Sequence, residues 1–371
     1  MKSTLQWWAV RFSALLLTAG AASTEERPPL REAFADQFRI GVAVTDDQVM
    51  GRAPAEARLI ARHFNTITPE NLLKWESVQP EPHIYMFEAS DAFAAFGERH
   101  DLFMVGHALV WHQQTPAWVF QDDEGRPATR EVLLARMKEH IDRVVGRYRG
   151  RIQAWDVVNE ALNADGSLRD SPWRKIIGDD YIERAFMFAH AADPAAELYY
   201  NDYEMVSAPK RAGAIALVRR LQAAGVPITG IGAQQHFSLD YPTLQAVEDT
   251  FAELGALGIK VMVTELDLTV LPNRSSENGA EVSRREAAAP ELNPYAAGLP
   301  VEVQAQLARR YADLFAIYRR HQDVLDRVTL WGLQDGKSWR NNWPIPGRTD
   351  YPLLFDRDLL PKPAFWSILA P

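Results

Sequence analysis

The stretch VMVTELDL, residues 261–268, joins a strand-like run to two acids. Its first four residues are apolar or β-branched, as expected for a strand that is buried on both faces of a parallel sheet. Glu265 and Asp267 follow at once. A buried carboxylate is costly unless it is paired or used in chemistry. The stretch therefore predicts a buried strand that delivers acidic side chains to a site at its carboxyl end.

Strand-like and helix-like segments alternate along the rest of the chain. The predicted strands are residues 38–44, 65–68, 103–111, 152–160, 197–203, 228–236, 260–268 and 327–335. The predicted helices are residues 53–64, 90–100, 129–150, 181–192, 208–225, 242–258, 301–321 and 363–370. Eight such units predict an α/β fold, a (β/α)8 TIM barrel in a single domain. A doubly wound open sheet is the alternative, but residues 41–51 lack its glycine-rich fingerprint.

Composition excludes several classes of function. The 371 residues carry a formal net charge of −9 and no Lys/Arg-rich block, so we expect no nucleic-acid partner. The chain has no cysteine, which excludes disulfides, Cys-ligated zinc and thiol catalysis. No additional hydrophobic helix suggests an interface between subunits, so we expect a monomer.

The N-terminal 23 residues are typical of a secretory signal. Lys2 and Arg11 precede or flank an apolar run at residues 14–22, and small residues follow it. We expect residues 1–23 to be a signal peptide, residues 24–371 to be the catalytic domain, and the protein to be secreted or periplasmic. The run is too short to span a bilayer, so no stable membrane association is expected. A disordered tail or a membrane anchor is the alternative.

Polar and aromatic side chains recur at the predicted carboxyl ends of the strands. In a barrel these ends converge on one rim, where active sites are built. The residues are Glu70, Asn71, Trp111, His112, Asn159, Glu160, Asn201, Asp202, Gln234, His236, Glu265, Asp267, Trp331 and Asp335. Glu160 and Glu265 are the most informative pair. Two carboxylates about 5–5.5 Å apart suit retaining glycoside hydrolysis, although two unrelated rim acids in salt bridges are the alternative.

Seven motifs resemble those of family 10 glycoside hydrolases, the endo-1,4-β-xylanases. WDVVNE (155–160) and VTELD (263–267) are similar to the two catalytic signatures of that family. Five supporting motifs occur in the family's order: TPENLLKWESVQP (68–80), GHALVWHQQTPAW (106–118), NDYE (201–204), GIGAQQH (230–236) and LWGLQDGKSW (330–339). Glu204 stands where the family usually has Asn, and Ala108 where it often has Thr. The loop-like segment 271–300 would lie on the barrel rim.

The resemblance implies an endo-1,4-β-xylanase that acts on xylan and xylo-oligosaccharides, retains configuration and needs no cofactor or metal. Glu160 would be the general acid/base and Glu265 the nucleophile. Asp156 and Asp267 would be support residues, with Asp267 orienting His236. The substrate-binding residues would be Glu70, Asn71, Lys74, His107, Trp111, Gln114, Asn159, Tyr203, Gln234, His236, Trp331 and Trp339. Tyr203 would lie on the leaving-group side.

Three other functions remain possible for such a barrel. A metal hydrolase would need ligands such as His107, His112 and His236, but no paired-His signature joins them. A non-catalytic sugar-binding barrel would lack one of the two glutamates. A different retaining β-glycosidase, acting on glucans or short glycosides, is the remaining competitor. The resemblance implies that Glu70, Asn71, Lys74 and the tryptophans at 331 and 339 favour xylan, because in the family's geometry bulky groups there leave little room for the hydroxymethyl group of glucose.

Overall fold

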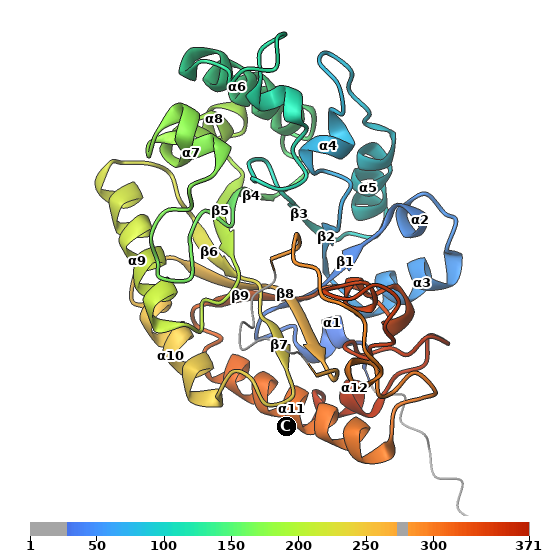
Figure 1. Ribbon diagram of the computed structural model, residues 1–371. Helices are drawn as coiled ribbons and strands as arrows, with labels where there is room; N and C mark the ends of the chain where they lie inside the picture. The colour runs from blue at the N-terminus through green and yellow to red at the C-terminus, as the bar shows by residue number, and fades with distance from the viewer. Residues whose placement is uncertain (1–27, 273–280, 371) are drawn as a thin grey trace, which may run out of the picture.

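The computed structural model describes residues 28–272 and 281–370. The predicted signal peptide, residues 1–23, lies outside the described residues, as does part of the segment 271–300. Parallel strands form the centre of the molecule and helices surround them (Figure 1). The strands are β1 (Arg39–Val44), β2 (Thr66–Pro69), β3 (Phe103–Gly106), β4 (Ala154–Asn159), β5 (Glu197–Asp202), β6 (Gly230–Ala233), β7 (His236–Ser238), β8 (Lys260–Thr269) and β9 (Leu325–Leu330).

The sheet closes on itself. Its order is β6-β5-β4-β3-β2-β1-β9-β8-β7, and a further pairing between β6 and β8 completes the ring. Every pairing between these strands is parallel. β7 pairs only with the carboxyl end of β8, beyond the closed ring. The predicted eight-stranded barrel is therefore confirmed.

The eight predicted helices are confirmed, with ends that shift by a few residues. They are α3 (Pro54–His63), α5 (Glu88–Arg99), α6 (Arg130–Arg147), α8 (Tyr181–Ala192), α9 (Ala208–Ala223), α10 (Leu244–Gly255), α11 (Val301–Arg320) and α12 (Pro363–Ser367). The sequence did not predict the short helices α1 (Leu30–Ala33), α2 (Asp46–Val49), α4 (Trp75–Val78) and α7 (Pro172–Ile177). Four 3₁₀ turns were also missed: η1 (Ala117–Phe120), η2 (Pro290–Leu292), η3 (Asp335–Lys337) and η4 (Trp339–Asn341). A single helical turn is too short to show a 3.6-residue period.

Three predicted strands were too long. The strand predicted at 103–111 ends at Gly106, where a Cβ atom would lie 2.2 Å from the ring of Trp155. The strand predicted at 228–236 is broken between β6 and β7, because Gln235 has a left-handed φ of 60° that an extended strand cannot contain. The strand predicted at 327–335 ends at Leu330. After β3 and β9 the chain leaves the sheet, whereas after β6 it pairs again as β7.

The inside of the barrel is filled below the site. Val105, Ala154, Tyr199 and Met262 form an apolar cluster. They come from β3, β4, β5 and β8, and β3 and β8 are not neighbours in the sheet, so these side chains meet across the barrel interior. This packing gives the polar groups above it a rigid floor. Within the described residues, the helices include none that is long and apolar enough to cross a membrane.

Candidate active site

Glu160 and Glu265 reach one cavity from different strands. Glu160 follows β4 with a left-handed φ of 57°, and its backbone N–H donates to Asn201 O at 2.9 Å. Glu265 lies within β8, and its backbone N–H donates to Gln234 O at 3.0 Å. A positive φ is uncommon for a residue with a side chain and often marks a functional position. The cavity is lined by Lys74, His107, Trp111, Asn159, Glu160, Gln234, His236, Glu265, Val282, Trp331 and Trp339.

The environment of Glu160 favours its protonated form. Burial and, after it, the nearby charge of Asp202 raise its pKa to about 7. Two neutral donors oppose this effect: Trp111 Nε1 donates to Oε2 at 2.9 Å, and Gln234 Nε2 donates to Oε1 at 3.0 Å. Hydrogen bonds to a carboxylate favour the ionised form, but here they are outweighed. Glu160 can therefore hold a proton near neutral pH and remain in one orientation.

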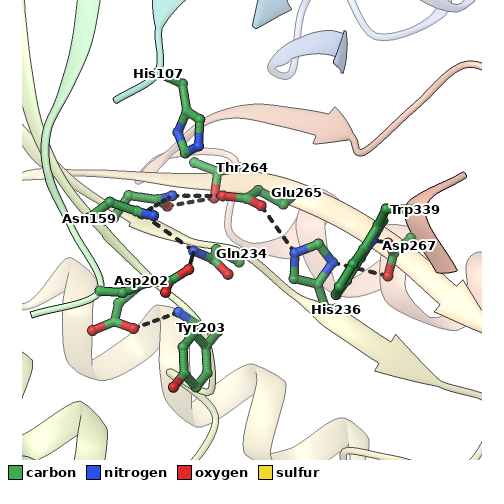
Figure 2. Close-up of polar contacts among 12 residues, drawn as sticks. His107, Asn159, Asp202, Tyr203, Gln234, His236, Thr264, Glu265, Asp267 and Trp339 are labelled. Atoms are coloured by element: carbon green, nitrogen blue, oxygen red, sulfur yellow. Dashed lines mark hydrogen bonds and ion pairs between the residues drawn. The ribbon is translucent and has the colours of Figure 1, made fainter. Parts of the chain in front are cut away.

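The environment of Glu265 favours its ionised form. Burial by itself would raise the pKa of Glu265, but the hydrogen bond and charge of His236 outweigh it and hold that pKa below its usual value. His236 Nε2 lies 3.1 Å from Oε2, and Asn201 Nδ2 donates to Oε1 at 2.8 Å (Figure 2). Both oxygens are thus fixed. Two buried carboxylates whose pKa values are pushed apart can take the roles of acid and nucleophile.

Asp267 keeps His236 charged. His236 Nδ1 lies 3.1 Å from Asp267 Oδ1, an ion-pair distance without hydrogen-bond alignment. Burial disfavours the imidazolium, but the charge of Asp267 overcomes it and raises the pKa of His236 to about 9. Burial also opposes ionisation of Asp267, yet Arg340 and His236 lower its pKa to about 2. Trp339 Nε1 donates to Asp267 Oδ2 at 2.6 Å. The predicted support role of Asp267 therefore has a geometric basis (Figure 2).

Polar contacts hold several of the predicted sugar-facing residues in two separate groups. Lys74 Nζ donates to Asn71 Oδ1 at 2.9 Å and to Gln114 Oε1 at 2.7 Å. His107 Nδ1 lies 2.9 Å from Asp156 Oδ2, so Asp156 supports the imidazole from below. Burial raises the pKa of Glu70 and lowers that of Lys74. Each of these shifts is opposed by the charge of the other residue, which indicates that the two side chains interact.

Two further predicted residues lie beside Glu160 and Glu265. Asn159 Oδ1 accepts hydrogen bonds from Asn201 Nδ2 at 3.0 Å and from Gln234 Nε2 at 3.4 Å. Tyr203 lies on the far side of Glu160, where its hydroxyl accepts from Arg169 Nη2 at 2.8 Å. The cavity lining includes Trp331 and Trp339 and excludes Glu70, Asn71, Gln114 and Tyr203. Those four flank it.

One rim residue named from the sequence does not join the site. Asp335 lies in η3, is fully buried, and pairs with Lys362 Nζ at 2.8 Å. It also accepts from the backbone N–H of Leu353 at 2.9 Å. The prediction that it faces the rim is wrong, because β9 ends before it and the chain turns away. Asp335 instead fastens the loop after β9 to the segment before α12.

Sequence reasoning assigned no role to three residues that hold Glu265 directly or through a neighbour. Asn201 was noted as a strand end but received no role, although it donates to both Asn159 and Glu265. Thr264 Oγ1 donates to Asn201 Oδ1 at 2.7 Å and fixes its amide. Arg340 donates to Asp267 Oδ1 from Nη2 at 2.8 Å. The only available signal was position, since Asn201 opens NDYE and Arg340 follows the tryptophan motif.

The histidines of the described residues are not arranged as metal ligands. Within residues 28–272 and 281–370, no three His, Asp or Glu side chains are grouped as a metal site requires. His107 and His236 instead contact carboxylates. His112 Nε2 lies 4.0 Å from Glu281 Oε2 and does not line the cavity.

Comparisons with known proteins agree with this geometry. The family model of glycosyl hydrolase family 10 matches residues 29–371. Endo-1,4-beta-xylanase A of Xylanibacter ruminicola is 44% identical over 355 residues, 96% of each chain. The structure of a GH10 endoxylanase from a sugarcane soil metagenome is 47% identical, with a TM-score of 0.89, over 92% of this chain and 99% of that one. A mutant solved in complex with xylotriose is 36% identical, with a TM-score of 0.81, over 92% and 99% of the two chains. The chain belongs to glycosyl hydrolase family 10.

Proposed function

We propose that this chain is an endo-1,4-β-xylanase that cleaves internal β-1,4-xylosidic bonds with retention of configuration, using Glu160 and Glu265. The observation that carries the proposal is the opposite shift of the two carboxyl pKa values within one cavity. Retaining hydrolysis needs one protonated and one ionised carboxyl group at the same bond. The named relatives are endo-1,4-β-xylanases, which supports xylan as the substrate class.

In the first step, ionised Glu265 attacks the anomeric carbon while protonated Glu160 donates its proton to the departing oxygen. Asn201 and His236 keep both oxygens of Glu265 oriented for this attack. The products are a covalent glycosyl-enzyme ester and a free leaving-group end of the chain.

In the second step, water gives a proton to Glu160 and attacks the anomeric carbon of the ester. The bond between that carbon and Glu265 breaks, which releases the sugar with retained configuration and restores ionised Glu265. The charge of Glu265 is one of the influences that raise the pKa of Glu160. When Glu265 is esterified it has no charge, so the pKa of Glu160 falls and the group becomes a better base. The change from acid to base follows from the proximity of the two side chains.

The bulk around the cavity is the reason to prefer xylan over glucan. Lys74, Trp331 and Trp339 line the cavity together with the two glutamates. A glucose unit carries a hydroxymethyl group that xylose lacks, and this group needs room beside the ring. We therefore expect β-1,4-glucans to be poor substrates.

The test is product release from unsubstituted xylan and, separately, from a β-1,4-glucan. Xylo-oligosaccharides of mixed length should appear early, and the glucan should release little. Glu160→Ala and Glu265→Ala serve as controls, because both should lose xylan hydrolysis. Single sugars as the only products, or faster cleavage of the glucan, would contradict the substrate assignment. Wild-type rates in both variants would contradict the catalytic assignment.

We further propose that residues 1–23 direct export, that residues 24–371 form the mature enzyme in the medium or periplasm, and that this enzyme is a monomer. The sequence of residues 1–23 supports the first part. N-terminal sequencing of protein recovered outside the cytoplasm should begin near residue 24. Light scattering should give the mass of one chain. An uncleaved N-terminus in a cytoplasmic fraction, or a larger mass, would contradict these proposals.

A further inference from the structure

A short segment after β8, residues 281–286, lies beside the catalytic pair and is called the strap below. Its backbone contacts the loop after β9, where Trp343 Nε1 donates to Glu281 O at 2.9 Å. The ring of Trp343 packs in turn on that of Trp339, with 4.7 Å between the ring centroids. Val282 lines the cavity that contains the two catalytic glutamates. The backbone of the strap is therefore fixed on the side of the site formed by the loop after β9.

The carboxylate of Glu281 contacts two other loops of the barrel rim. Gln113 Nε2, in the loop after β3, donates to Oε1 at 2.5 Å, and Arg169 Nη1, in the loop after β4, donates to Oε2 at 3.0 Å. The hydroxyl of Ser283 also donates to Oε1, at 2.9 Å. Burial by itself would raise the pKa of Glu281, but the hydrogen bond from Ser283 and the charge of Arg169 hold that pKa below its usual value. Glu281 is therefore an ionised group that joins the strap to the loops after β3 and β4.

Arg169 holds the backbone of the acid/base residue. The left-handed φ of 57° at Glu160 is unfavourable for a residue with a side chain, and it persists only where the surrounding structure imposes it. The N–H of Glu160 donates to Asn201 O at 2.9 Å, and its carbonyl oxygen accepts from Arg169 Nε at 3.1 Å. Arg169 Nη2 also donates to the Tyr203 hydroxyl at 2.8 Å. Arg169 thus makes one of the contacts that impose the conformation from which the Glu160 side chain reaches the cavity.

Glu281 supplies the strongest contact of the Arg169 guanidinium. The carbonyl of Glu160 and the hydroxyl of Tyr203 are neutral acceptors, whereas a hydrogen bond from a guanidinium to a carboxylate is roughly twice as strong as a neutral one. Among the residues that the structure describes, Glu281 is also the one carboxylate within ion-pair distance of Arg169. The side chains are 17% and 29% exposed for Arg169 and Glu281, so water screens the pair only in part. Without Glu281, the guanidinium would keep only neutral acceptors and could turn toward solvent.

We propose that Glu281 is a positioning residue for acid catalysis, and that it acts through Arg169 to keep the backbone of Glu160 in the conformation that directs its carboxyl group at the leaving-group oxygen. The proposal rests on the catalytic roles proposed above for Glu160 and Glu265. Glu281 itself does not line the cavity, so its effect on the reaction passes through the guanidinium. The strap after β8, the strand of the nucleophile, thereby orients the acid/base residue that follows β4.

The test compares kcat/KM for two aryl xylobiosides, phenyl xylobioside and dinitrophenyl xylobioside. Departing phenolate needs a proton from Glu160, whereas dinitrophenolate is a good leaving group and needs little protonation. The ratio of the two kcat/KM values, phenyl over dinitrophenyl, therefore isolates acid catalysis, and it does not depend on the fraction of folded enzyme. Glu281→Ala should lower this ratio by about tenfold, the effect expected when one charge-assisted hydrogen bond that orients the acid is lost.

Further variants test whether Glu281 acts through Arg169. Arg169→Met should lower the ratio at least as much as Glu281→Ala does, and adding Glu281→Ala to Arg169→Met should change it by less than about twofold, because the link is already broken. If Arg169→Met does not fold, Arg169→Lys takes its place, since an ammonium group cannot bridge the three acceptors of the guanidinium. Glu286→Gln is the matched control, because Glu286 lies on the same strap but pairs with Arg284. It should keep the wild-type ratio.

The outcomes separate this proposal from the proposed function. Equal losses for both substrates in Glu281→Ala, which leave the ratio at its wild-type value, would mean that Glu281 only stabilises the strap, and they would overturn the positioning role. A further large fall when Glu281→Ala is added to Arg169→Met would overturn the path through Arg169. If the wild type hydrolyses neither aryl xylobioside nor xylan, the proposed function fails. If the wild type hydrolyses all three and the ratio is unchanged in Glu281→Ala, only the positioning role fails.

Discussion

Replacing Trp111 with Phe should move the basic limb of the pH profile upward. Trp111 Nε1 donates to Glu160 Oε2 at 2.9 Å, and Trp111 is only 5% exposed. A hydrogen bond to a charged group contributes ~1.5–3 kcal/mol. The neutral acid retains part of this bond, because its carbonyl oxygen still accepts. About 1 kcal/mol then distinguishes the two protonation states, which at ~1.4 kcal/mol per unit is a pKa rise of about 0.7.

The sign follows from which form the donor stabilises. Loss of the indole N–H destabilises ionised Glu160, so the proton is held to higher pH and the acid stays active longer. From a pKa of about 7, the basic limb should move to about 7.7. At pH 8 the protonated fraction should rise from about 9% to about 33%, roughly a fourfold gain relative to the acidic plateau.

The assay is kcat/KM for an unactivated xylo-oligosaccharide between pH 4 and 9, normalised to the plateau, since kcat/KM reports the free enzyme. Trp118→Phe is the control, because Trp118 Nε1 donates to Pro80 O and does not contact Glu160. Its basic limb should stay in place. A limb that is unchanged in Trp111→Phe, or that moves to lower pH, would refute the assignment of Glu160 as the titrating acid.

Three further predictions concern other parts of the molecule. Glu265→Ala should abolish hydrolysis of an aryl xylobioside. Added azide should restore turnover and give a glycosyl azide of inverted configuration, which NMR detects. A glycosyl azide of retained configuration would contradict nucleophilic catalysis by Glu265. Asp335→Asn leaves Lys362 buried without its counter-charge. Urea denaturation should therefore show a loss of about 3 kcal/mol in unfolding free energy, while kcat at 25 °C stays at the wild-type value. A large fall in kcat without a loss of stability would instead place Asp335 in the active site. Gly106→Ala should lower the melting temperature, because the added Cβ would lie 2.2 Å from the Trp155 ring. Overpacking of this kind costs about 1–3 kcal/mol of unfolding free energy. An unchanged melting temperature would mean that the ring can move away.

The barrel could be predicted because its signals are local. Each strand is a short apolar run and each long helix has its own period, so the βα units are visible without any knowledge of their neighbours. Glu160 and Glu265 were found for the same reason, since each directly follows or lies in such a run. The exact strand ends were not predictable, because they depend on the conformation of the folded backbone, as at Gln235, where a left-handed φ of 60° separates β6 from β7.

The family resemblance assigned the roles of acid/base and nucleophile to Glu160 and Glu265, but the sequence did not show the contacts that set their charge states. Glu160 and Glu265 are both glutamates at strand ends, and nothing in their neighbours along the chain gives them opposite pKa shifts. The difference arises from Asp202 near one and from His236, held by Asp267, near the other. Electrostatic effects depend on distance and burial in three dimensions, which only the closed barrel sets.

The sequence alone determined the (β/α)8 architecture, the family resemblance and the identity of the two glutamates, because these depend on short-range pattern. The tertiary structure decided which polar groups meet. It turned Asp335 away from the rim toward Lys362, and it brought Glu281 to Arg169, 112 positions earlier in the chain. Loops have no hydrophobic period, and their contacts are fixed by packing between distant segments. For that reason the ion pair between Glu281 and Arg169 could not be predicted from the sequence.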